Sequence, residues 1–150
     1  MGLINFSIKG GNENPTKFVA NARNFKVIVD EPAELGGTDH GPNPVEYLLA
    51  GYAGCLNVVA HLVAKEFGIE IKKLAIEVDG DINPARLFGQ SNEDRAGFKN
   101  IHVNINIDTD ADQLSIDKWL KEVENRCPIN DNLRNITPVS VKVSTFEFAA

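Results

Sequence analysis

Two stretches in the middle of the chain alternate apolar and polar residues at every position. Leu74 to Asp79 and Ile101 to Ile107 follow this period of two, which is typical of strands with one buried face. They predict two antiparallel neighbours, joined by a long loop over Asn83 to Lys99. A further alternating set predicts a strand at the end of the chain: Val139, Val141, Val143 and Phe146.

The start of the chain predicts a β meander. Leu3 to Ile8 alternates modestly and is followed by a turn signal at Gly10-Gly11-Asn12. Phe18 to Ala22 and Phe25 to Val29 then have the composition of short strands. A loop rich in Pro and Gly, from Asp30 to Asn43, leads out of this meander.

A long helix is predicted next, because its first residues form a complete cap signal. Asn43 suits the N-cap, Pro44 the first helical position and Glu46 the position whose carboxylate reaches back to the cap amide. The helix should end near Phe67, followed by Gly68 as the C′ residue. Its middle is apolar on nearly every side, so we expect other parts of the protein to enclose it.

A second, amphipathic helix should start at Asp110 or Asp112 and end before Pro128. It is predicted from apolar positions at helical spacing: Leu114, Ile116, Trp119, Leu120 and Val123. The predicted order is therefore β-β-β-α-β-β-α-β, an α+β fold in which an antiparallel sheet wraps around one long buried central helix.

Composition and charge narrow the possible functions. The chain has 150 residues, 43% of them apolar, as expected for a single domain spanning 1–150. A net charge of −6 and no run of Lys or Arg argue against a nucleic-acid partner. The first residues lack an apolar leader, which favours a cytoplasmic protein. The apolar tract Val45 to Ala64 contains Glu46, Asn57 and His61, so a buried helix is favoured over a membrane span.

The candidate chemistry rests on two cysteines, since the sequence contains no C-x-x-C motif or Cys/His cluster. Cys55 lies in the apolar helix, where Gly51 and Gly54 would let another backbone approach closely. It is either an inert core residue or a reactive thiol. Cys127 precedes Pro128 and follows Arg126, so it either begins a short helix that favours its thiolate or simply marks a chain reversal.

The segment from Asn43 to Cys55, NPVEYLLAGYAGC, resembles the N-P-E-x-L-x-A-x-x-x-A-x-C helix of the OsmC/Ohr family, and Cys127-Pro128-Ile129 matches its second motif. The resemblance implies an OsmC-like fold and an intertwined homodimer with its active sites at the subunit boundary. It also implies a peroxidatic Cys55 and a resolving Cys127 that reduce organic hydroperoxides without a metal or organic cofactor. The reductant would be a dithiol, such as a lipoylated protein.

The match to the family is incomplete near the start of the helix. Val45 stands where the hydroperoxide-resistance branch has a Glu that holds an activating arginine. Glu46 falls on roughly the opposite side of the helix from Cys55, so we interpret it as a cap. Arg23 is our first candidate for the activating arginine, with Arg86 and Arg95 as alternatives.

The histidines offer a weaker route to thiol activation. His61 lies about 120° around the helix from Cys55, so no contact between them is expected. We expect it to be buried or at an interface, and we place His102 on the polar face of its strand. His40 stays open.

Two other functions compete with the peroxidase. One is an OsmC-like dimer that binds a small molecule or a partner protein without turning over peroxide, which the missing Glu at Val45 favours. The other, a general thiol–disulfide oxidoreductase, is less favoured because such proteins usually keep both cysteines in a C-x-x-C motif.

Overall fold

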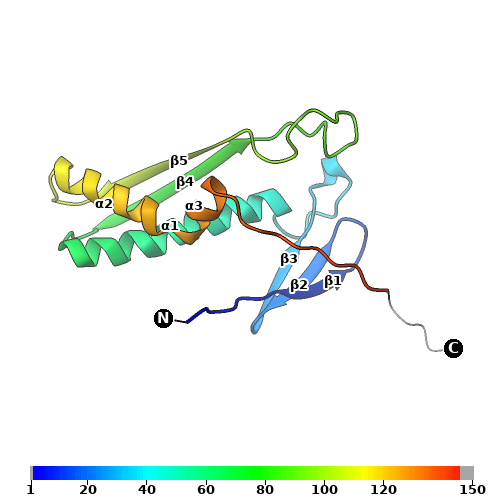
Figure 1. Cartoon of the computed structure of the whole chain (residues 1–150), viewed down its shortest axis with the longest axis horizontal. Coiled ribbons are helices and arrows are strands. Elements are labelled where there is room, and N and C mark those ends of the chain that lie inside the picture. The colour runs from blue at the N-terminus through cyan, green and yellow to red at the C-terminus, as the bar shows by residue number, and fades with distance from the viewer. Residues whose placement is uncertain (1, 146–150) are drawn as a thin grey trace.

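The computed structural model describes residues 2–145, and its α+β arrangement confirms the predicted fold class (Figure 1). Its elements are, in order, β1 (Lys9–Asn12), β2 (Phe18–Ala22), β3 (Phe25–Val29), a 3-10 turn η1 (Ala33–Leu35), α1 (Pro44–Phe67), β4 (Lys73–Asp81), β5 (Asn100–Asp108), α2 (Gln113–Arg126) and α3 (Pro128–Arg134). The strands form two separate antiparallel sheets, β1-β2-β3 and β4-β5.

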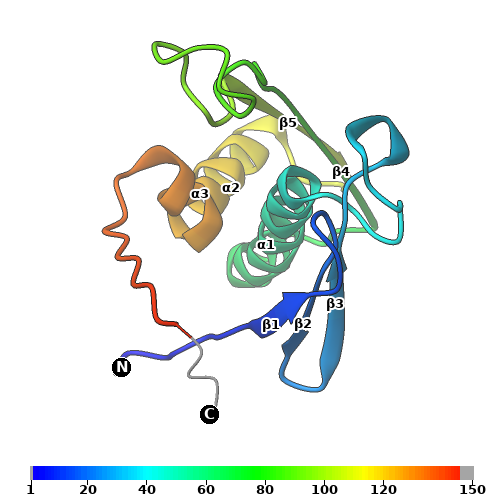
Figure 2. The same cartoon turned by 90° about the vertical axis from the view of Figure 1, so that its right-hand side faces the viewer.

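The core lies between the β4–β5 sheet and the three helices. In this sheet Ile76 stands opposite Ile105 and Val78 opposite Val103, so the predicted antiparallel pair is confirmed. Figure 2 looks along α1 and shows it between β4–β5 and the pair α2 and α3. Trp119 of α2 is fully buried, and its indole N–H donates to the carbonyl oxygen of Ala60 at 2.9 Å. Its buried polar atom is therefore paired, as close packing requires.

The caps of α1 are those expected from the sequence. The Asn43 side chain accepts from the Glu46 amide at 2.9 Å, and the Glu46 carboxylate accepts from the Asn43 amide at 2.8 Å. Gly68 ends the helix with φ 68°, a left-handed conformation in which glycine has no Cβ penalty. Local hydrogen bonding thus sets both ends of α1.

One face of α1 stays uncovered within the chain. Val58 and Leu62 are 58% and 51% exposed, and a Cβ added to Gly51 or Gly54 would meet nothing within 4 Å. The expected enclosure and close approach at these glycines are therefore not made by residues 2–145. Within residues 2–145, α1 is the one helix long and apolar enough to span a membrane, a property that core helices share.

The N-terminal sheet differs from the prediction. Leu3 to Ile8 form no strand, and the predicted turn residues Gly10 to Asn12 belong to β1, paired with β2. A Cβ on Gly10 would lie 2.3 Å from the Val19 carbonyl oxygen, so glycine allows this pairing. The turn falls later, where the Asn14 side chain accepts from the Lys17 amide at 2.6 Å.

Two contacts anchor this sheet to the rest of the chain. The Tyr47 hydroxyl of α1 donates to the Ile28 carbonyl oxygen at 2.8 Å. Asp30, fully buried after β3, accepts from the amides of Glu31, Thr38 and His40. The loop that leads into α1 is thereby folded around one carboxylate.

The predicted C-terminal strand is not found. Val139, Val141 and Val143 have no strand structure and are 82–92% exposed, and Phe146 lies outside the described residues. Figures 1 and 2 show that the segment after α3 runs away from the β4–β5 sheet. An alternating sequence becomes a strand only when it pairs with another strand, and no strand within residues 2–145 pairs with this segment.

Candidate active site

The fold brings the two cysteines into contact. Their Sγ atoms are 2.8 Å apart although the residues lie 72 positions apart in sequence. Cys55 is half-buried on α1, and Cys127 is fully buried between α2 and α3. A disulfide bond is about 2.05 Å long, so these two free thiols could be oxidised to one with little backbone movement.

Cys127 is held by the start of α3. It is the N-cap of that helix, with Pro128 at the first position, which confirms the predicted helical start. Its Sγ accepts from the Asn130 amide at 3.4 Å. An N–H donor of this kind favours a negatively charged sulfur.

The positive charge of Arg126, expected to favour the Cys127 thiolate, is paired with a carboxylate instead. Its guanidinium makes two contacts with the Glu66 carboxylate, at 2.6 and 3.0 Å. This pair holds the pKa of Glu66 below and that of Arg126 above its ordinary value, chiefly through the shared hydrogen bonds. Glu66 therefore compensates the positive charge of Arg126. The ion pair also joins α2 to α1.

The pKa of the Cys55 thiol is raised above its ordinary value. Burial is the largest cause and the hydrogen bond with Cys127 is the second, while repulsion between the two sulfurs adds a smaller increase. The Ile129 amide acts in the opposite direction. Cys55 therefore keeps its proton more strongly than an isolated thiol.

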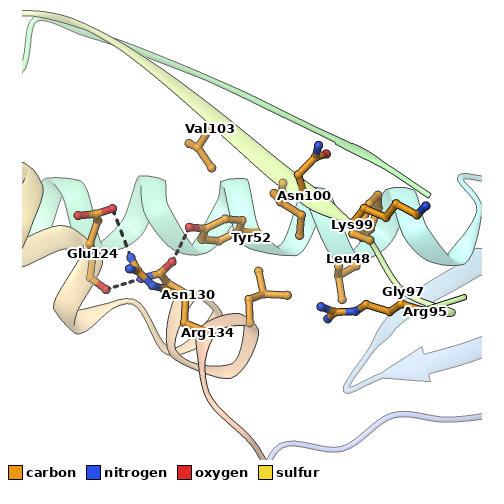
Figure 3. A pocket seen from close by; sticks show the side chains of 13 residues that line it. Leu48, Tyr52, Arg95, Gly97, Lys99, Asn100, Val103, Glu124, Asn130 and Arg134 are labelled. Atoms are coloured by element: carbon orange, nitrogen blue, oxygen red, sulfur yellow. Dashed lines mark hydrogen bonds and ion pairs between the residues drawn. The ribbon is translucent and has the colours of Figure 1, made fainter. Parts of the chain in front are cut away.

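A second polar contact lies beside the sulfurs and was missed in the sequence. The Tyr52 hydroxyl donates to the Asn130 Oδ1 at 2.6 Å, and the Asn130 Nδ2 donates to the Glu124 carbonyl oxygen at 2.8 Å (Figure 3). The sequence did contain a signal for this contact. Tyr52 places a hydroxyl in an apolar helix three residues before Cys55, and a buried hydroxyl needs a hydrogen-bond partner.

A pocket of about 610 Å³ opens over this contact (Figure 3). Tyr52 and Asn130 line it, together with apolar residues such as Leu48 and Leu133. Three cations also line it, namely Arg95, Lys99 and Arg134. Its walls thus combine apolar surface with positive charge, close to the helices that hold the thiols.

The three candidate arginines lie in different places. Arg23 sits in the β2–β3 turn with φ 58°, its guanidinium 5.1 Å from the centre of the Phe25 ring. That turn lies at the end of its sheet remote from α3 in both views (Figures 1 and 2). Arg86 binds the carbonyl oxygen of Asn92 within its own loop. Of the three, only Arg95 lines the pocket.

The histidines stay away from the sulfurs. The His40 ring nitrogen is 3.1 Å from the Lys17 ammonium, and His61 contacts the Asn57 carbonyl at 2.8 Å on an exposed part of α1. His102 is opposite Asp79 on the exposed face of β4–β5, as predicted. In the described part of the chain, no three His, Cys, Asp or Glu side chains group as metal ligands would.

Comparison with known proteins agrees with this architecture. The chain is 26% identical over 122 residues to a hydroperoxide reductase of Mycoplasma pneumoniae, with 80% of each chain covered. It is 28% identical over 120 residues to organic hydroperoxide resistance protein OhrB of Bacillus subtilis, covering 79% of this chain and 80% of that one.

Its fold is also similar to a solved structure, the OsmC-like protein of Mycoplasma pneumoniae. The TM-score is 0.77 at 23% identity, with 89% of each chain covered. A family model described as OsmC-like protein matches residues 37–142, the part that holds both cysteines and all three α-helices. This chain therefore belongs to the OsmC-like protein family.

Proposed function

We propose that this chain is a thiol-dependent peroxidase that reduces organic hydroperoxides, with Cys55 as the peroxidatic and Cys127 as the resolving cysteine. The observation that carries the proposal is the 2.8 Å separation of the two sulfurs. The names of the Mycoplasma and Bacillus relatives support a peroxidase-type activity in the family. The roles follow from access, because Cys55 is half-buried and Cys127 fully buried.

The proposed cycle balances in three steps. The Cys55 thiolate attacks one oxygen of the hydroperoxide, the O–O bond breaks, and the leaving alkoxide takes a proton to become an alcohol. Cys127 then attacks the sulfur of the resulting sulfenic acid, hydroxide leaves as water after protonation, and a disulfide forms. An external dithiol returns two electrons by thiol–disulfide exchange and is itself oxidised. We place this cycle in the reducing cytoplasm.

The pocket lined by Tyr52 and Asn130 supports an organic substrate, although neither sulfur lines it. Leu48 and Leu133 provide apolar wall, and a volume of about 610 Å³ exceeds what hydrogen peroxide needs. Arg95 is positioned to act on a ligand in this pocket. Arg23, the first candidate from sequence, would have to reach the site of a second copy.

We further propose that the chain works as an intertwined homodimer. It exposes 11809 Å² of surface, whereas a compact monomer of this size exposes about 7,500 Å². The surplus of about 4,300 Å² per chain is larger than the roughly 1,000–2,500 Å² per partner that obligate dimers commonly bury, so covering it requires an extensive, intertwined interface. It includes the open face of α1 and two terminal segments with exposed apolar side chains, among them Phe6 and Val141. A second copy would cover these surfaces and supply strand edges.

Peroxide titration tests the activity. Cumene hydroperoxide added to reduced protein should consume both thiols and form one intramolecular disulfide. In Cys127→Ser a sulfenic acid should persist on Cys55, detected as a dimedone adduct by intact mass, because serine still caps α3 but cannot resolve. Cys55→Ser should leave Cys127 largely unreacted. Arg23→Gln and Arg95→Gln, compared for their rates of Cys55 oxidation, identify the activating cation.

A non-catalytic, ligand-binding dimer is the second candidate. The raised pKa of Cys55 and the presence of Val45 in place of the family's Glu favour it. If both thiols of the native protein survive excess cumene hydroperoxide, the peroxidase proposal fails and this candidate replaces it.

A further inference from the structure

The two elements that carry the cysteines are joined by a second contact next to the sulfurs. Tyr52 lies three residues before Cys55 on α1, and Asn130 lies three residues after Cys127 on α3. Residues three apart share one face of a helix, so the oxygen contact and the sulfur contact lie side by side. At 2.6 Å, with both side chains largely buried, the contact between Tyr52 and Asn130 is short, and it forms part of the pocket wall.

Asn130 is connected in three directions. Its Oδ1 accepts from Tyr52, its Nδ2 donates to the Glu124 carbonyl of α2, and its own amide donates to the Cys127 Sγ. Moving this side chain would therefore disturb the link to α1, the link to α2 and the donor on the sulfur together. No side-chain nitrogen or oxygen buried within residues 2–145 lacks a hydrogen bond, so the buried polar atoms of Tyr52 and Asn130 are all paired.

α3 needs such a connection because it is short. A helix of 7 residues is not stable by itself in water, so its place depends on what it contacts. Resolution of a sulfenic acid requires the second sulfur to be within reach at once, and its rate depends on the effective concentration of that thiol.

We propose that Tyr52 and Asn130 are positioning residues for disulfide closure: they keep α3 against α1 while the Cys55–Cys127 bond forms and breaks. The predicted effect on the rate of disulfide closure rests on the proposed peroxidase function. The same role also sets the equilibrium between the dithiol and the disulfide, which involves no peroxide.

Tyr52→Phe is the main test, with Tyr47→Phe as a matched control. Tyr47 is on the same helix and its hydroxyl also donates one hydrogen bond, to Ile28, far from the cysteines. Rapid mixing with cumene hydroperoxide separates Cys55 oxidation from disulfide closure, so any effect of Tyr52→Phe on the pocket that Tyr52 lines is measured in the first step and not in the second. Disulfide closure should slow about tenfold in Tyr52→Phe only, since one buried hydrogen bond is lost there.

Two further measurements separate this role from general stability and from the peroxidase itself. Equilibration with a glutathione redox buffer should show about a tenfold lower effective concentration of the thiol pair in Tyr52→Phe, whether or not peroxide reacts. Asn130→Asp, which keeps the acceptor for Tyr52, should close faster than Asn130→Ala. Unchanged closure and equilibrium in Tyr52→Phe, equal effects in Tyr47→Phe, or slowing confined to Cys55 oxidation would overturn the inference.

Discussion

At the scale of single residues, the chemistry depends on how each sulfur is surrounded. Burial and the neighbouring Cys127 thiol disfavour ionisation of Cys55, whereas the Ile129 amide favours it. The positive charge next to Cys127 in the sequence is paired with Glu66 in space. Within residues 2–145, Arg126 is therefore not a free positive charge for the Cys127 thiolate.

This balance predicts the pH dependence of Cys55 oxidation. A raised pKa leaves little thiolate at neutral pH, and the thiolate is the nucleophile. The second-order rate with cumene hydroperoxide should thus rise about tenfold per pH unit between about pH 6 and 8. Stopped-flow rates at several pH values measure this; a rate already level at pH 7 would mean that an activating cation has lowered the pKa.

A second pH effect is expected from Asp30. Hydrogen bonds, first that of the Thr38 hydroxyl and then backbone amides, hold the pKa of this carboxyl well below its ordinary value. Its stabilisation is present above the unfolded pKa of about 3.9 and is lost as pH falls towards the folded value. The native protein should unfold at higher urea than Asp30→Asn at pH 7, and the gap should narrow at pH 3. A constant gap would contradict this assignment.

At the scale of elements, the ends of the helices are set by local signals. Asn43, Glu46 and Gly68 cap α1, and Cys127 with Pro128 begins α3, all as the sequence predicts. The two terminal segments behave differently. Their alternating residues stay exposed because neither segment pairs with a strand within residues 2–145.

The capping role of Glu46 can be separated from catalysis. Glu46→Gln keeps an acceptor for the Asn43 amide, so it should leave both the unfolding free energy and the rate of Cys55 oxidation close to native. Asn43→Ala should lower the unfolding free energy by about 1 kcal/mol in urea at fixed protein concentration. A large loss of Cys55 oxidation in Glu46→Gln would instead assign this carboxylate to the active site.

At the scale of the whole molecule, a single chain leaves one side of its longest helix open. Val58 and Leu62 stand out on that side, next to Gly51 and Gly54, which allow close approach. This arrangement suits a second helix or strand from another copy better than solvent.

Oligomeric state tests that proposal directly. Light scattering at micromolar concentration should give the mass of two chains for the native protein. Val58→Glu combined with Leu62→Glu should shift the mass to one chain, because two buried charges would be unpaired. Asn106→Glu, on the exposed face of β5, serves as the control and should stay dimeric. A native mass of one chain would exclude the dimer.

Much of this structure follows from the sequence because it depends on neighbours along the chain. Alternation identified β4 and β5, cap residues identified α1 and α3, and local context marked Cys55 and Cys127 as candidate thiols. The errors concern pairing: Gly10 lies in a strand because of its fit against Val19, and the segment around Val141 is not a strand.

Periodicity and capping are local properties, so they predict the fold class, the helix starts and the two candidate thiols. Three contacts depend instead on tertiary packing: the sulfurs 2.8 Å apart, the Arg126–Glu66 pair, and the hydrogen bond from Tyr52 to Asn130 beside the thiols. These contacts join residues about 60 or more positions apart. Their geometry depends on how α1, α2 and α3 pack, which no local pattern specifies.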